Sequence, residues 1–185
     1  WMHFGQDFDS LDGSIGVETA TTDMSSMFYA EPSFNEPIGS WDVGCVTDIS
    51  NMFRSAVNFD QPLNSWDVSN VTNMEYMFHQ ADEFNQPLDS WDVSNVTDME
   101  AMFHKAHEFN QPIDNWDVSN VTNMMAMFGS RSSPMKFNQP LNSWDVSNVT
   151  NMETLYINCR DFNQPLHNWD VSNVTDMEAM FNNAR

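Results

Sequence analysis

Apolar and polar positions recur along this chain with a regular period from Trp41 to Arg185. The marker of each unit is a tryptophan, and successive tryptophans are separated by 25, 25, 25, 28 and 25 residues. These markers are Trp41, Trp66, Trp91, Trp116, Trp144 and Trp169. A fixed period of this length predicts stacked supersecondary units, none of which buries its apolar face alone.

The first part of each unit has the pattern of a strand. In the unit from Leu63 to Pro87, Trp66 and Val68 alternate with the polar Asp67. A period of two predicts a short strand that buries one face. Stacked units would then pair these strands in parallel.

The second part of each unit has helical spacing. Its apolar residues lie at i, i+3, i+4 and i+7, and they are Met74, Met77, Phe78 and Ala81. Thr72, three residues before Glu75, has the spacing of a capping box, and Pro87 prevents a helix from continuing. The fold class predicted is an α/β solenoid, a right-handed coil with a parallel sheet on one face and short helices on the other.

The repeat predicts one domain over residues 1–185. Residues 1–21 are interpreted as a degenerate N-terminal cap, and residues 22–185 as repeats of about 25 residues that are open at the C-terminal end. An open strand edge at residues 166–171 is a liability, so we expect either that the natural chain continues or that another molecule covers the edge, and a second copy of the chain is one such molecule.

The negative charge of the chain limits the classes of partner that it can bind. Formal net charge is −21, with only six lysines and arginines. Such a field disfavours nucleic acid and anionic membrane surfaces. There is no apolar run of membrane-spanning length, so we expect no membrane insertion. Cations, basic partners or solubility remain as reasons for the acidity.

The two cysteines belong to units far apart in the stack. Cys45 and Cys159 lie four to five units apart, which is on the order of 20 Å at strand-like spacing. A disulfide needs Cα atoms within about 7 Å. We therefore expect two free thiols.

One aspartate per unit is expected to point outward, because it lies between a buried Trp and a buried Val. This Asp column consists of Asp42, Asp67, Asp92, Asp117, Asp145 and Asp170. Small polar residues share the predicted face, among them Ser65, Ser90 and Asn115. We interpret this polar sheet face as the ligand-binding surface for a protein or glycan partner.

Two other interpretations of the acidic residues stay open. Calcium takes oxygen ligands, and the acids at Asp89, Asp92, Asp114 and Asp117 could supply them. Alternatively, each Asp accepts backbone N–H bonds from the turn that follows it. No cofactor is required.

Other columns of polar residues also have structural explanations. The asparagines at Asn70 and Asn85 recur in later units and are expected to bond turn and corner backbone groups. His79, His104 and His107 could in principle hold zinc or copper, although exposed histidines are commoner.

The repeated string Trp-Asp-Val-Ser-Asn-Val-Thr-x-Met-x-x-Met-Phe and the corner Phe-Asn-Gln-Pro-Leu carry a family resemblance. They resemble the short repeat of mycoplasmal and other microbial surface proteins, grouped with BspA-type leucine-rich-repeat proteins. The resemblance covers residues 22–185. It implies a leucine-rich-repeat-like solenoid at the cell surface or outside the cell, used in adhesion or partner binding, without catalytic residues.

No catalytic constellation is recognisable in the sequence, since every candidate carboxylate is one of a series. We expect a non-enzymatic surface or secreted binding module that uses the Asp-lined face. The alternative is a structural, calcium-responsive acidic wall or matrix protein.

Overall fold

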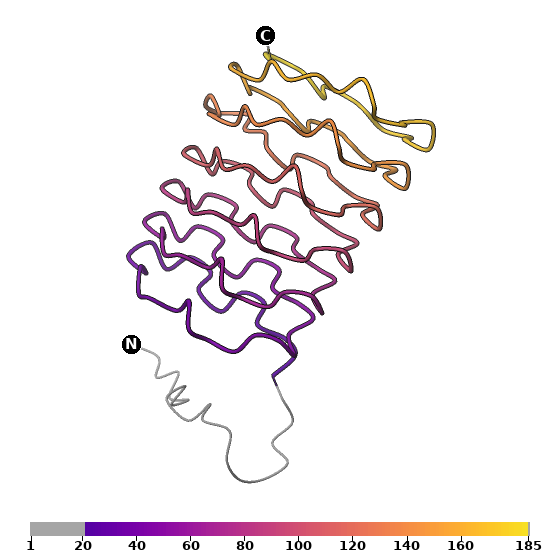
Figure 1. Cartoon of the computed structure of the whole chain (residues 1–185). Helices are drawn as coiled ribbons and strands as arrows, with labels where there is room; N and C mark the ends of the chain where they lie inside the picture. Colours follow the sequence, from indigo (N-terminus) through magenta and orange to yellow (C-terminus); the bar gives the residue numbers. More distant parts are fainter. Residues whose placement is uncertain (1–20, 185) are drawn as a thin grey trace.

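The computed structural model describes residues 21–184. Seven successive coils of the chain lie one upon another in a single column, with the N-terminal coils at one end and the C-terminal coils at the other (Figure 1). The predicted cap over residues 1–21 falls almost wholly outside the described residues.

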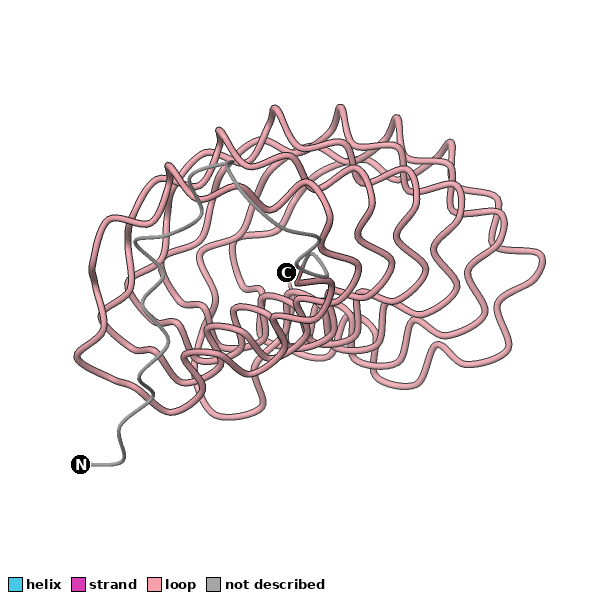
Figure 2. Cartoon of the chain, turned by 90° about the horizontal axis from the view of Figure 1, so that it is seen from below, coloured by secondary structure: helices cyan, strands magenta, loops and turns pink. Residues whose placement is uncertain are grey.

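The predicted helices and strands are absent from the described coils. Between residues 21 and 184 there is no helix, and the only strand-type pairs are single-residue parallel bridges. Figure 2 accordingly shows these residues as loops and turns throughout. The bridges join Asp23, Asp48, Asn73, Asp98, Asn123, Asn151 and Asp176 in sequence. The α/β solenoid with a leucine-rich-repeat-like sheet and helices is therefore wrong, although the repeats do lie in register.

A row of turns replaces the expected helix at residues 74–81 and its equivalents. Alternate N–H groups donate to the next coil, as in Phe78 to the carbonyl of Met102 at 2.9 Å. The N–H groups between them close short turns, as in Met77 to Met74 at 3.2 Å. An α-helix would instead bond each N–H to the carbonyl four residues earlier in the same segment.

The spacing of the apolar residues explains why the helix prediction failed. Tyr76 and Gln80 both have positive φ, 55° and 60°, so the backbone turns once every four residues. Positions i, i+3, i+4 and i+7 share a face at a period of four almost as well as at 3.6. Over eight residues, the two periods cannot be told apart.

The expected strand is broken by turns at both ends of Trp66. The backbone N–H of Trp66 donates to the carbonyl of Leu63 at 3.0 Å. After the Trp-Asp-Val segment, the N–H of Val71 donates to the carbonyl of Val68 at 2.9 Å. Contact with the preceding coil is made by the indole instead, since Trp66 Nε1 donates to the carbonyl of Ile38 at 3.0 Å. The same bond recurs at Trp91, Trp116, Trp144 and Trp169.

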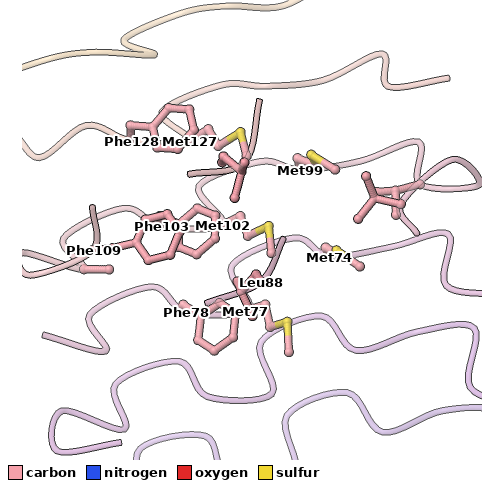
Figure 3. Packing of buried hydrophobic residues seen from close by; sticks show 14 of the residues in the cluster. Met74, Met77, Phe78, Leu88, Met99, Met102, Phe103, Phe109, Met127 and Phe128 are labelled. Carbon is pink, nitrogen blue, oxygen red and sulfur yellow. The ribbon is translucent and has the colours of Figure 1, made fainter. Parts of the chain in front are cut away.

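The core consists of columns of like residues. Phe78 stacks on Phe103 with ring centroids 5.6 Å apart, and Phe103 on Phe128 at 6.0 Å. Figure 3 shows these three rings one above another, with a methionine preceding each. A second phenylalanine column packs beside the first, with Phe84 4.0 Å from Phe78. All four rings are fully buried, and burial of aromatic surface is the main favourable term for each coil.

Side-chain amides bond successive coils at their corners, as the sequence predicted. Asn95 Nδ2 donates to the carbonyl of Ser69 at 2.7 Å, and Asn85 Oδ1 accepts the N–H of Asn110 at 3.0 Å. The capping-box prediction is wrong. Thr72 Oγ1 donates to the carbonyl of Thr47 in the preceding coil rather than capping a helix.

Both cysteines are free thiols, as predicted. Cys45 is exposed, whereas Cys159 is buried and donates to the carbonyl of Phe128 at 3.2 Å. Burial raises the pKa of the Cys159 thiol to about 12, so it stays protonated and inert.

Replacing Trp91 by Phe tests the indole bond. The change keeps an aromatic ring but removes the donor to the Leu63 carbonyl, which lies 2.9 Å from Nε1. A buried carbonyl without its partner should lower the free energy of unfolding by about 1–3 kcal/mol, measured by urea denaturation. The half-buried Trp169, changed to Phe, is the control and should lose less. Equal losses in the free energy of unfolding at both positions would show that burial of the indole bond does not determine its contribution.

Replacing Tyr156 by Phe should stabilise the protein. Tyr156 takes a phenylalanine position in the core, and its hydroxyl is buried without a partner among the described residues. Removing that hydroxyl should raise the free energy of unfolding by about 1 kcal/mol. In the matched variant, Tyr76→Phe, a bond to Glu100 of 2.6 Å is lost and no gain is expected. A Tyr156→Phe variant less stable than the parent would refute this.

Candidate binding surface

The Asp column predicted from the sequence lies on the outside of the coils. All six of its aspartates are exposed. Neighbouring carboxylates in the column lie close together, because a Cβ built on Gly44 would be 3.4 Å from Asp42 Oδ1 and 3.5 Å from Asp67 Oδ2. The structure therefore brings these residues together as a row, but not on a sheet.

Each aspartate in the column holds the turn that follows it. Asp92 Oδ1 accepts the N–H of Ser94 at 3.0 Å, and Asp117 Oδ1 accepts that of Ser119 at 3.1 Å. The other four members make the same bond two residues on. The structural interpretation of these aspartates is thus confirmed, and it leaves one carboxylate oxygen of each outside this bond.

In four members of the column these bonds lower the pKa of the carboxyl group, and the four are Asp67, Asp92, Asp145 and Asp170. The Ser69 hydroxyl and then the Ser69 N–H lower the pKa of Asp67, and Ser94 lowers the pKa of Asp92 in the same two ways. The neighbouring charge of Asp67 opposes the shift at Asp92. A row of fixed negative charge results.

The small polar residues beside the Asp column are exposed but already bonded. Ser65 Oγ donates to the carbonyl of Gly39 at 2.6 Å, and Asn115 Nδ2 to that of Asp89 at 2.6 Å. Ser90 Oγ donates to the carbonyl of Asn64. Their donors tie each coil to the preceding one, so a ligand would meet mainly the carboxylates.

The proposed calcium ligands do not gather into a cluster. No group of three or more His, Cys, Asp or Glu side chains among the described residues could hold a metal ion. Asp89 Oδ1 instead accepts from Asn64 Nδ2 at 3.1 Å, and Asp114 Oδ1 from the N–H of Ser143 at 3.3 Å. Asp92 and Asp117 hold their turns as described above.

The histidines likewise do not converge on one point. His79 and His104 stack with ring centroids 5.1 Å apart, and the Nδ1 atoms of both are buried without a partner among the described residues. His107 lies against Asp82, with Nδ1 3.3 Å from Oδ1, and its Nε2 contacts Ser133.

A second column of Asp and Asn was missed in the sequence. At the bridge positions, Asp98 Oδ1 accepts the N–H of Glu100 at 2.8 Å, as its counterparts do in each coil. Asn73 Nδ2 also donates to Asp48 Oδ2 in the preceding coil at 3.2 Å. Where an Asn lies next to an Asp in this column, a hydrogen bond between the two side chains replaces the repulsion that two carboxylates would have. The recurring Asn or Asp directly after Thr was the available signal.

A three-residue expansion, which lengthens the gap between Trp116 and Trp144 to 28 residues, lies between Phe128 and Phe137 in the fifth coil. It begins after Gly129, where a Cβ would come within 2.7 Å of the Thr154 carbonyl oxygen. Arg131 Nη2 lies 3.3 Å from Glu153 Oε1, and Lys136 pairs with Glu108. These pairs engage two of the six lysines and arginines with acidic side chains outside the Asp column.

Within the described part of the chain, no helix is long and apolar enough to cross a membrane.

The histidine pair should make stability depend on pH. Burial, followed by the charge of His104, lowers the pKa of His79 to about 3, with Arg54 and Lys105 acting in the same direction. Burial also lowers the pKa of His104 to about 4, with smaller contributions from Lys105, Arg131 and His107. Below the unfolded value of about 6.5, the unfolded chain binds more protons than the folded chain.

Stability should therefore fall between about pH 6.5 and 4, by about 2 kcal/mol, since both rings keep some solvent contact. The raised pKa of Glu75 acts in the opposite direction. The His79→Gln variant should flatten this decline in urea-denaturation free energy. His167→Gln, at an exposed histidine, should leave it unchanged. An unchanged slope in His79→Gln would refute the assignment.

Comparison with known proteins gives one family. The sequence model of the family described as "Mycoplasma protein of unknown function, DUF285" matches residues 17–105 and 87–185. No curated protein and no solved structure matches the chain. The match agrees with the expected mycoplasmal repeat but does not extend to the BspA-type leucine-rich-repeat group. The two matched segments together span most of the sequence, and the chain belongs to this Mycoplasma repeat family.

Proposed function

We propose that this protein is a non-enzymatic binding module, displayed at the cell surface or secreted, that contacts a basic protein partner along the Asp column. The observation that carries the proposal is the row of exposed carboxylates, each held by a bond to the N–H two residues on. Fixed charge of one sign attracts a partner of the opposite sign and speeds association.

Pre-organisation supports this use of the surface. Because Oδ1 of Asp92 and of Asp117 already bonds the backbone, each side chain loses little freedom when a partner binds. The lowered pKa values of Asp67 and Asp145 favour charged carboxylates at neutral and mildly acidic pH.

Two observations support the proposed location at the cell surface or outside the cell, the family resemblance of the repeat and the family match. The Trp-Asp-Val-Ser-Asn-Val-Thr repeat resembles BspA-type surface proteins, and the family match is to Mycoplasma proteins. Adhesion is the more specific function that we propose for this binding module. No specific observation favours a calcium-responsive wall protein, since the acids at Asp89, Asp92, Asp114 and Asp117 form no ion-holding cluster.

Neutralising two central charges tests the proposal. In an Asp92→Asn, Asp117→Asn double variant, each side chain keeps an oxygen for its turn bond but loses its charge. Binding to immobilised basic proteins and glycans should be measured with and without calcium. We expect binding to basic proteins to weaken about tenfold, which corresponds to about 1.4 kcal/mol, and to depend less on salt.

The control has the same net charge but alters other positions. It carries Glu31→Gln and Glu83→Gln, two exposed residues outside the Asp column, and it should bind as the parent does. Binding that is equal in all three proteins would defeat the proposal. So would binding to glycans only, or to no member of the panel.

A further inference from the structure

A serine, a histidine and an aspartate from three successive coils contact one another outside the Asp column. His107 Nε2 contacts Ser133 Oγ, and His107 Nδ1 lies 3.3 Å from Asp82 Oδ1. Asp82 and His107 have equivalent positions in the third and fourth coils, 25 residues apart. Ser133 belongs to the three-residue expansion of the fifth coil, so the repeat pattern does not predict this contact.

The loop that carries Ser133 is tied to the sixth coil on both sides. Before Ser133, the N–H of the fully buried Ser130 donates to the carbonyl of Ile157 at 3.0 Å. After it, the N–H of the buried Met135 donates to the carbonyl of Asn158 at 3.1 Å. The Asn158 amide also donates to the carbonyl of Ser130 at 2.5 Å. Bonds on both sides of Ser133 therefore hold the loop in place.

The chemistry of the three groups determines the direction of proton donation. An ionised carboxylate has no proton to donate, and it repels a nitrogen lone pair that faces it. Asp82 therefore favours the neutral His107 tautomer that carries its proton on Nδ1. The Nε2 atom then has a free lone pair, so it accepts a hydrogen bond from the hydroxyl of Ser133.

This arrangement prepares a serine for nucleophilic attack. A hydroxyl is a weak nucleophile until an adjacent base takes its proton, and a third group must hold that base in the correct tautomer. Ser133, His107 and Asp82 have the contacts that these three roles require. All three are half-buried, so a small molecule can reach the hydroxyl from solvent.

The backbone N–H groups next to Ser133 are not free to hold an oxyanion. Those of Ser132 and Ser133 both donate to Ser130 Oγ, at 3.4 and 3.3 Å, and Pro134 has no N–H. In enzymes, a single oxyanion donor contributes a factor of about 10²–10³ in rate. Unactivated esters and amides should therefore not react here, and an ester formed on Ser133 should hydrolyse slowly.

We propose that Ser133 is a nucleophile that accepts an acyl group from an activated ester and retains it. Ser133 Oγ attacks the carbonyl carbon while its proton passes to His107 Nε2. The bond between that carbon and the leaving oxygen then breaks, and Nε2 gives the proton to the leaving alcohol or phenol. The products are an ester on Ser133 and the free alcohol or phenol.

The proposed modification goes beyond the partner binding proposed above. It is a single covalent event without turnover, so it is compatible with a non-enzymatic binding module. It involves no residue of the Asp column, and the two proposals can be tested separately.

Acetylation by p-nitrophenyl acetate, resolved by site, tests the proposal. The exposed Cys45 is first alkylated so that its thiol does not consume the ester. Peptide mass spectrometry should then find an acetyl group on Ser133, formed together with free p-nitrophenol. Ser132, which is exposed in the same loop but bonds only to Ser130, should stay unmodified over the same time.

Removing the base should slow the reaction. His107→Gln should lower the rate of Ser133 acetylation at least about 100-fold, since general base catalysis typically contributes this much or more. His167→Gln makes the same substitution at an exposed histidine elsewhere and should leave the rate unchanged. Urea denaturation checks that each variant is folded under the assay conditions.

Asp82 is a positioning residue, and its role has a spectroscopic signature. In Asp82→Asn, the new amide can donate to Nδ1, which moves the imidazole proton to Nε2 and blocks the base. Nitrogen NMR of the His107 imidazole should show this change of tautomer. Acetylation of Ser133 should slow at least about tenfold in the same variant.

The proposal is overturned if Ser133 of the parent chain is acetylated no faster than Ser132, or if its rate is unchanged in His107→Gln. Continuous release of p-nitrophenol with no acetyl group kept on Ser133 would contradict the retention of the acyl group. A slower reaction in Asp82→Asn with the proton still on Nδ1 would remove the role assigned to Asp82.

Discussion

The fold depends on a row of backbone hydrogen bonds that all run in one direction from coil to coil. Four alternate N–H groups per coil make these bonds, while the peptide units between them close turns within the coil. Positive φ angles at every fourth residue, as at Tyr76 and Gln80, permit this geometry. The core columns, the side-chain ladders and the outward row of aspartates all require that register.

Side chains of three residue types, tryptophan, asparagine and threonine, also bond neighbouring coils and help to fix the register. The indoles of the tryptophans donate to carbonyls of the preceding coil, which provides a buried bond at each step. Threonine hydroxyls and asparagine amides at the turns also donate to carbonyls of the preceding coil, and asparagine oxygens at the corners accept N–H groups of the next coil. Each side-chain bond contributes only about 1 kcal/mol, but it recurs in nearly every coil.

The sequence alone predicted the register, the core and the free thiols, because these depend on the period. It did not predict the backbone conformation. Eight residues with apolar positions such as Met74 and Phe78 fit a period of 3.6 or of four, and a threonine before a glutamate is only a weak sign of helix. The strand prediction failed because the bond from the Ser69 N–H to Asp67 turns the chain directly after the Trp-Asp-Val segment. The sequence correctly predicted that the Asp column is exposed, whereas the bonding of Ser65, Ser90 and Asn115 to neighbouring coils required the structure.

Trans-hydrogen-bond scalar couplings measured by NMR test the central claim most directly. The account predicts a coupling between the amide nitrogen of Phe78 and the carbonyl carbon of Met102, in the next coil. A helix over residues 74–81 would instead couple that nitrogen to the carbonyl carbon of Met74. A coupling to Met74, with none to Met102, would contradict the account.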